Sequence, residues 1–149
     1  MGNSYISCYV HYVFSTKSHK NWLEPYLKEK LFPYIGGICR ENNLKLIKAG
    51  GVDDHLHLLV SLPSTIIIAK AIQHIKGGSS RWVHETFGNM KDFAWQEGYG
   101  GFTIGVSQIN QTKEYIANQE DHHRKKTFWE EFIDFLNYHG IKFEEKYLL

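Results

Sequence analysis

Two short apolar runs on either side of a glycine pair most limit how this 149-residue chain can fold. Residues 44–49 and 54–62 flank Gly50-Gly51, a pattern typical of two antiparallel strands joined by a tight turn. Pro63 ends the second run, because proline has no amide hydrogen to give to a strand ladder. Alternation along 54–62 predicts one core-facing side, which carries Leu56, Leu58, Val60 and Leu62.

The rest of the chain predicts alternating strands and helices. Aromatic and β-branched residues alternate over 5–14 and indicate a strand, and shorter strands are expected near 92–96 and 101–106. Apolar residues at helical spacing predict helices over 24–43, 65–87 (with Ser64 as N-cap), 108–122 and 127–139. This order predicts an α+β, ferredoxin-like (RRM-like) fold. Its split β-α-β antiparallel sheet would have helices on one face, an open second face, and an added C-terminal helix that bears Tyr115.

Composition favours one folded domain, 1–149, with a core over about 4–123 and a helical tail over about 127–149. Hydrophobic residues make up 42% and charged residues 22%, which is unlike a disordered chain. Lys70 interrupts the longest apolar cluster, and the N-terminus lacks the pattern of a signal peptide, so a cytoplasmic protein is expected. Cys8 and Cys39 have no metal-like spacing and are interpreted as core residues.

The sequence Asp54-His55-Leu56-His57 places two imidazoles on one side of the second hairpin strand. Residues i and i+2 of a strand point the same way, about 6–7 Å apart along the chain. His55 and His57 therefore lie on the face opposite the leucines and are candidates to hold one divalent ion. In isolation, such a motif is more often a pair of half-exposed strand histidines without a ligand.

A second pair, Tyr115 and Gln119, lies four residues apart in a helical pattern. Such residues share one helix face. A phenol is a candidate nucleophile, and a carboxamide oxygen is a candidate ligand for a hard metal ion. Taken alone, the pair is also what an ordinary amphipathic helix would carry.

The order of these motifs carries more information than any one of them. Asp54–His57 is followed by Lys76-Gly77-Gly78-Ser79-Ser80-Arg81, by Trp95–Tyr99, and by Tyr115–Gln119 with His122-His123. From His11 to about His123 the chain closely resembles the single-tyrosine transposases of the His-hydrophobe-His (HUH) endonuclease superfamily. These are small insertion-sequence transposases, and the REP-associated tyrosine transposases are their relatives.

The resemblance implies a metal-assisted tyrosine transposase. His55, His57 and Gln119 would hold Mg²⁺ or Mn²⁺, with Asp53 and Asp54 as candidates for an added acidic ligand. Tyr115 would attack the scissile phosphate and form a 5′-phosphotyrosine with a free 3′-OH. The general base stays open, with His122 and His123 as candidates.

The resemblance also implies single-stranded DNA with hairpin ends as the partner, bound in a bacterial or archaeal cell and nucleoid-associated in the bound state. A homodimer is expected, in which the tyrosine helix of one subunit completes the metal site of the other. Phosphate contacts would come from basic side chains, bases would stack on aromatic ones, and His11 would face the site. The candidates for phosphate contact are Lys17, Lys20, Lys76, Arg81, Arg124 and Lys125. The candidates for base stacking are Tyr9, Trp95 and Tyr99.

Three other functions stay open at this point. A domesticated REP-type nickase would share all of this chemistry and differ only in its genomic surroundings. A non-catalytic hairpin DNA-binding protein would not need His55, His57, Tyr115 and Gln119, all of which are present. A rolling-circle replication initiator usually carries a second tyrosine or a helicase part, and neither is apparent.

Overall fold

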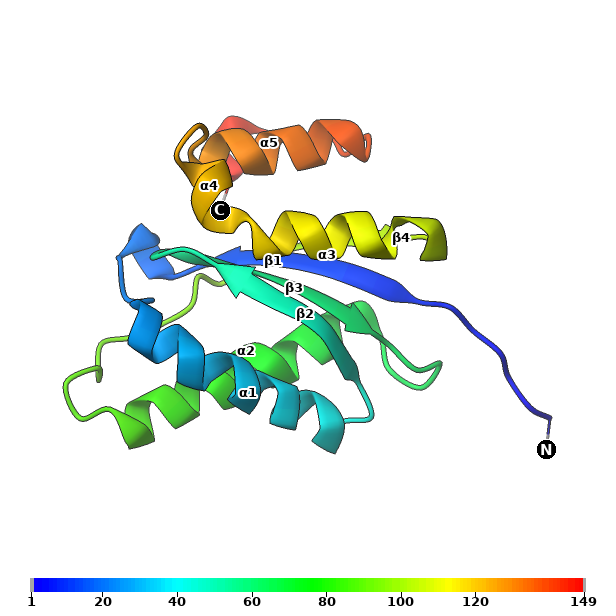
Figure 1. The fold of residues 1–149 in the computed structure, drawn as a ribbon, viewed down its shortest axis with the longest axis horizontal. Helices are drawn as coiled ribbons and strands as arrows, with labels where there is room; N and C mark the ends of the chain where they lie inside the picture. The colour runs from blue at the N-terminus through cyan, green and yellow to red at the C-terminus, as the bar shows by residue number, and fades with distance from the viewer. Residues whose placement is uncertain (1, 149) are drawn as a thin grey trace.

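The computed structural model describes residues 2–148, and its centre is a four-stranded antiparallel sheet (Figure 1). The strands run in the order β2-β3-β1-β4 across the sheet. Their bounds are β1 (Tyr9–Ser15), β2 (Lys45–Gly51), β3 (His55–Ser61) and β4 (Gly100–Ile104). The hairpin predicted around Gly50-Gly51 is confirmed, because β2 pairs with β3 through Gly50↔His57 and Gly51↔Leu56.

Helices lie on both faces of the sheet (Figure 1). The first face is covered by α1 (Pro25–Glu41) and α2 (Ile68–Thr86). The second is covered by α3 (Ile109–Ala117), α4 (Gln119–His123) and α5 (Phe128–Tyr138). Short 3₁₀ turns are η1 (Lys17–His19), η2 (Val106–Gln108) and η3 (Glu145–Tyr147).

The main core lies between the sheet and α1/α2. Alternation decides which side chains enter it: Tyr12 pairs with Leu58 in adjacent strands, and both are fully buried in this cluster. The predicted inward face of β3 is thereby confirmed. Cys39 is buried in this core, as predicted, whereas Cys8 is half-buried at its edge.

A smaller cluster fills the space between the sheet and α5. Helix α5 is amphipathic, and its apolar side packs on the second face of the sheet. The face that the sequence analysis predicted to be open is therefore covered. Thr127 caps this helix by accepting a hydrogen bond from the Glu130 amide, 3.3 Å away. The members of the cluster are Val13, Phe102, Phe128, Phe132 and Leu136.

Several predicted element bounds are wrong. Residues 5–8 precede β1, and near 92–96 the structure has an isolated bridge, Thr16↔Trp95, in place of a strand. Helix α2 starts at Ile68 with Ile67 in the N-cap position, so Ser64 caps nothing. The helix predicted over 108–122 is broken at Asn118, whose backbone (φ −102°, ψ 27°) leaves the helical region.

Helix α3 lies directly against β2. A Cβ built on Gly50 would lie 2.2 Å from the carbonyl oxygen of Ile116, so only glycine allows this approach. Because Ile116 follows Tyr115, the contact sets the height of the tyrosine above the sheet. Among residues 2–148, no helix combines the length and the apolar character needed to cross a membrane.

Candidate metal centre and nucleophile

Strand register brings three imidazoles together on the second face of the sheet. His55 and His57 come from β3, and both are fully buried. His11 lies on the adjacent β1, and its Nε2 lies 2.8 Å from Nδ1 of His57. The structure therefore places His11 beside the two strand histidines.

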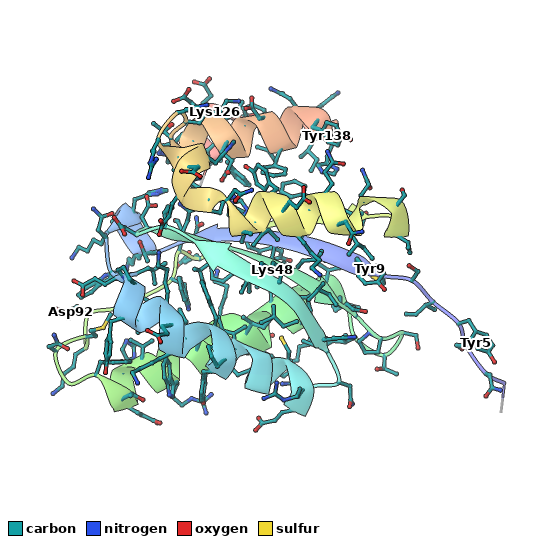
Figure 2. The ribbon with its side chains drawn as sticks, in the orientation of Figure 1. Tyr5, Tyr9, Lys48, Asp92, Lys126 and Tyr138 are labelled. Atoms are coloured by element: carbon teal, nitrogen blue, oxygen red, sulfur yellow. The ribbon has the colours of Figure 1, made fainter. Side chains whose placement is uncertain are left out.

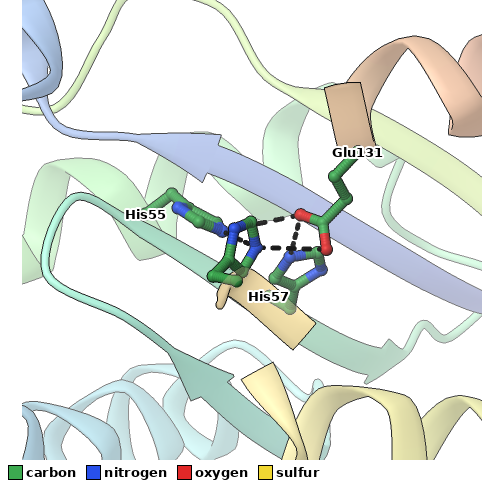
Figure 3. A group of neighbouring side chains, drawn as sticks. His55, His57 and Glu131 are labelled. Carbon is green, nitrogen blue, oxygen red and sulfur yellow. Dashed lines mark hydrogen bonds and ion pairs between the residues drawn. The ribbon is translucent and has the colours of Figure 1, made fainter. Parts of the chain in front are cut away.

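Two further side chains, from α4 and α5, complete the cluster. One ligand atom from each of His55, His57, His123 and Glu131 lies within 4.8 Å of the others. Glu131 reaches from α5 toward the two strand histidines (Figure 3), and its Oε1 lies 2.8 Å from Nε2 of His57. His123 Nε2 lies 2.9 Å from His55 Nε2 and 3.2 Å from Glu131 Oε2. Three imidazoles and one carboxylate form a donor set that suits a divalent cation.

Burial and mutual contact shift the protonation of these groups. Burial lowers the pKa of His57, so that its ring is held in the neutral form in which imidazole binds metals. Burial also opposes charge on His55, but hydrogen bonding to Asp54 and Glu131 outweighs it and raises the pKa. Burial would raise the pKa of Glu131, yet His123, His55 and His57 hold it well below its usual range.

Asp54 fixes the orientation of one ring of the cluster. Its Oδ1 lies 2.8 Å from Nδ1 of His55, which directs Nε2 of that ring toward the cluster. Asp54 thus contacts His55 on the side of the ring that faces away from the cluster, whereas the Asp53 side chain is exposed. Of the two acidic candidates near the motif, only Asp54 touches a cluster residue through a described side-chain contact.

The phenol of Tyr115 lies beside this cluster. Its ring centroid is 5.7 Å from that of His57, and its hydroxyl donates a hydrogen bond to Glu131 Oε2. Nε2 of His122 lies 3.0 Å from the same hydroxyl. Burial and the Glu131 carboxylate raise the pKa of Tyr115, so the phenol is protonated at neutral pH.

Gln119 is buried at the break between α3 and α4. Its Nε2 donates to the carbonyl oxygen of Tyr115 at 3.1 Å, which ties the amide to the turn of helix that carries the phenol. Its Oε1 is buried and has no hydrogen-bond partner among the described residues. A buried amide oxygen without a partner is costly, and a cation would satisfy it.

The predicted DNA contacts lie in different environments. His11 is buried, and the Lys76 ammonium donates to carbonyl oxygens of Gln96 and Gly98 at 2.6 and 2.8 Å. Lys76 thus contacts the loop before β4 in this structure. Exposed side chains are Lys17, Lys20, Arg81, Arg124 and Lys125.

The predicted stacking residues are mostly packed within the protein. The Trp95 ring is 7% exposed and lies 4.9 Å from that of Phe14, and its Nε1 donates to Ser79 Oγ. Tyr99 packs against Tyr12, and Tyr9 is half-buried.

Sequence reasoning missed Glu131 as a member of the cluster and considered His123 only as a base. Glu131 lies 74 residues after His57 in a helix with three acidic residues, and nothing in the spacing separates it from Glu130. The apolar stripe of α5 is the one available signal. Phe128, Phe132 and Leu136 share a face, and Glu131 lies beside that face.

Comparisons with known proteins match this chain to a transposase family. Residues 4–119 match the family described as "Transposase IS200 like". The transposase of insertion sequence IS200 from Salmonella typhimurium is 25% identical over 119 residues, which cover 76% of this chain and 77% of the relative. The ISDra2 transposase TnpA of Deinococcus radiodurans is 24% identical over 123 residues, covering 74% and 88%.

Solved structures share the fold. A crystal structure of a Deinococcus radiodurans protein described as a transposase superposes with a TM-score of 0.66 at 24% identity, and covers 80% of this chain and 96% of that one. A REP-associated tyrosine transposase bound to a REP hairpin gives a TM-score of 0.61 at 16% identity, with coverage of 83% and 73%. The matched segment 4–119 ends before His123 and Glu131, which lie outside it.

Proposed function

The chain belongs to the IS200-like transposase family, and from this premise we propose that it cleaves and rejoins single-stranded DNA at hairpin-flanked sites through a 5′-phosphotyrosine. The observation that carries the proposal is the contact between the Tyr115 phenol and a buried cluster of metal-ligand type. A nucleophile held beside such a cluster is what strand transfer needs.

The residues present fit Mg²⁺ or Mn²⁺. The cluster offers imidazole nitrogens and a carboxylate, without a thiolate, and the partnerless Oε1 of Gln119 adds an amide oxygen in the same region of the fold. His55 and His57 would hold the ion, with Gln119, His123 and Glu131 as further ligands. When bound, the ion supplies positive charge that polarises and orients the scissile phosphate.

Tyr115 performs the covalent step. Its phenolic oxygen forms a bond to phosphorus, and the bond from phosphorus to the 3′ oxygen breaks. The phenol loses its proton and the departing 3′ oxygen gains one, so the number of phosphate esters is unchanged and the linkage can be resealed without ATP. His122 Nε2 and the Glu131 carboxylate lie within hydrogen-bond distance of the phenolic hydroxyl.

The DNA partner is proposed from a relative and from surface charge. One structural relative is bound to a REP hairpin, and the exposed basic residues of this chain supply phosphate contacts. The exposed candidates of the predicted set are Lys17, Lys20, Arg81, Arg124 and Lys125. His11 and Lys76 would act by positioning His57 and the loop 96–98.

The homodimer stays part of the proposal. Within a single chain, the Tyr115 hydroxyl donates a hydrogen bond to Glu131. Exchange of the tyrosine helix by a hinge at Gly105, the residue between β4 and η2, would replace this contact with an equivalent one between subunits. Sedimentation equilibrium on free and DNA-bound protein tests the dimer, and a monomer in both states at micromolar concentration contradicts it.

The deciding experiment is an adduct assay. Labelled single-stranded DNA with the palindromic ends that flank the gene is incubated with the protein and Mg²⁺ or Mn²⁺. We expect a protein–DNA band that survives denaturation, depends on metal and disappears in Tyr115→Phe. Tyr26→Phe, at a phenol that is 62% exposed on α1, is the matched control. Hairpin binding without an adduct would favour a DNA-binding protein, and a band in Tyr115→Phe would move the nucleophile to Tyr99 or Tyr138.

Two further variants test the metal ligands. His55→Ala or His57→Ala should abolish the adduct but retain much of the hairpin affinity, because phosphate contacts are distributed over the surface. Normal cleavage by either variant with purified Mg²⁺ would overturn the assignment.

Matching imperfect palindromes around the gene would favour a mobile element over a domesticated nickase.

A further inference from the structure

A cavity of about 400 Å³ lies between α3 and α5 and reaches Tyr115. His55 and His57 are fully buried and do not line this cavity, whereas half-buried Tyr115 lines it together with Glu131. A DNA strand can therefore approach the phenol from the cavity side without first uncovering the histidines. One of the two nucleotides that flank the reacting phosphate would then lie in the cavity.

The walls of the cavity are aromatic. The Phe135 ring meets the rings of His11 and Tyr115 edge-on, with centroids 5.1 and 5.6 Å apart. His139 and Tyr138 extend this wall toward solvent, and Tyr138 is 75% exposed. Figure 2 shows Tyr138 near the end of α5 that lies farthest from Lys126. Such surfaces attract flat heteroaromatic groups by stacking.

The polar groups of the cavity do not suit a phosphate. Its carboxylates are Glu131 and Asp134, and its one lysine, Lys126, is ion-paired with Asp134. Burial lowers the pKa of the His139 ring. On the α3 side, Gln108, Gln111 and Thr112 offer neutral donors and acceptors of the kind that contact base edges.

We propose that this cavity takes the base of a nucleotide next to the scissile phosphate, stacked beside Phe135 and Tyr138 and contacted by the side-chain amides of Gln108 and Gln111. The inference rests on the proposed function for the position of the phosphate. A pocket of this volume accommodates one nucleotide. The consequence is that α3 and α5 together read DNA at the cleavage point, in addition to the hairpin.

The first test measures base binding without cleavage. Saturation-transfer NMR on the full chain, without metal, compares the four deoxynucleosides with 2-deoxyribose 5-phosphate, which has no base. We expect transfer to at least one nucleoside and none to the sugar phosphate. Gln111→Trp, at an exposed cavity residue, should abolish the transfer, and Asn110→Trp, at the exposed neighbour outside the cavity, should retain it. Equal signals from nucleosides and sugar phosphate, or no difference between the two variants, would overturn the proposal.

The second test places the base in the reaction. In the hairpin substrate, the nucleotide on each side of the scissile phosphate is replaced in turn by an abasic analogue. We expect the rate of adduct formation to fall roughly 10-fold to 100-fold for one side, in line with the contribution of one stacked base. Abasic substitution three nucleotides away is the control.

The outcomes separate the two proposals. One outcome is a saturation-transfer signal from nucleosides that Gln111→Trp abolishes, with no adduct on natural DNA. It would support the base pocket and contradict tyrosine strand transfer. A normal adduct with both flanking abasic substrates would contradict the base pocket and leave strand transfer intact.

Discussion

Replacing Gly50 by alanine should move the tyrosine helix. The new Cβ would lie 2.2 Å from the Ile116 carbonyl oxygen, below the 3.0 Å that such contacts need, so α3 or β2 must shift by about 0.8 Å. Overpacking of this kind costs about 1–3 kcal/mol of unfolding free energy. The carbonyl is backbone, so rotamer changes cannot relieve the clash, and Tyr115, one residue away, must move with it.

The shift should affect the chemistry more than metal binding. Displacement of a reacting group by about 1 Å costs on the order of 100-fold in rate, so the Gly50→Ala variant should form the adduct about 100-fold more slowly. Metal affinity should change less than the rate, because two of the proposed ligands, His55 and His57, lie on β3 and not on the displaced α3. Urea unfolding followed by tryptophan fluorescence, calorimetric metal titration and single-turnover adduct formation measure the three quantities.

Gly77→Ala is the matched control. Gly77 is an exposed residue of α2, and nothing lies within 4 Å of a Cβ built there. Alanine should stabilise this helix by up to about 1 kcal/mol and leave the adduct rate unchanged. A Gly50→Ala protein with wild-type stability and adduct rate would refute the argument that this contact positions Tyr115.

Three more outcomes follow from single side chains. Burial raises the pKa of Cys39 to about 11, so iodoacetamide at pH 8 should label half-buried Cys8 and spare Cys39 in peptide mapping. Thr127→Ala should lower the stability of α5 by about 1 kcal/mol, because it removes the N-cap. Hydrogen exchange should then be faster for the amides of that helix alone. Glu131→Gln should destabilise the metal-free protein by about 3–5 kcal/mol at pH 7. Because the folded pKa of Glu131 is lowered, its contribution is present above the unfolded value of about 4.3. The difference from wild type should therefore shrink as pH falls below that value, and a pH-independent difference in chemical denaturation would contradict the assignment.

Local pattern determined the hairpin, the four strands of the sheet and the two helices on its core face. Period-2 alternation in β3 separates the leucines from His55 and His57 with no information from the rest of the chain. Spacing of four residues in a helix likewise identifies Tyr115 and Gln119. These signals are short-range, because each depends only on backbone geometry within a few residues.

Long-range packing decided the rest. The sequence does not indicate that α5 folds back over the second face of the sheet, because its apolar stripe is equally compatible with other partners. That packing converts a face predicted to be open into a buried one and brings Glu131 into contact with His57 and Tyr115. The break at Asn118 similarly aims His123 at His55.

The sequence by itself thus determined the two strand histidines, the tyrosine and the sheet on which they lie, because each is specified by neighbours along the chain. Only the tertiary structure decided that Glu131 and His123 complete the cluster, and that Gln119 is tied to the backbone of Tyr115 with a partnerless oxygen. Those contacts join residues up to 76 positions apart, from His55 to Glu131, and burial of apolar surface between α5 and the sheet is what brings them together.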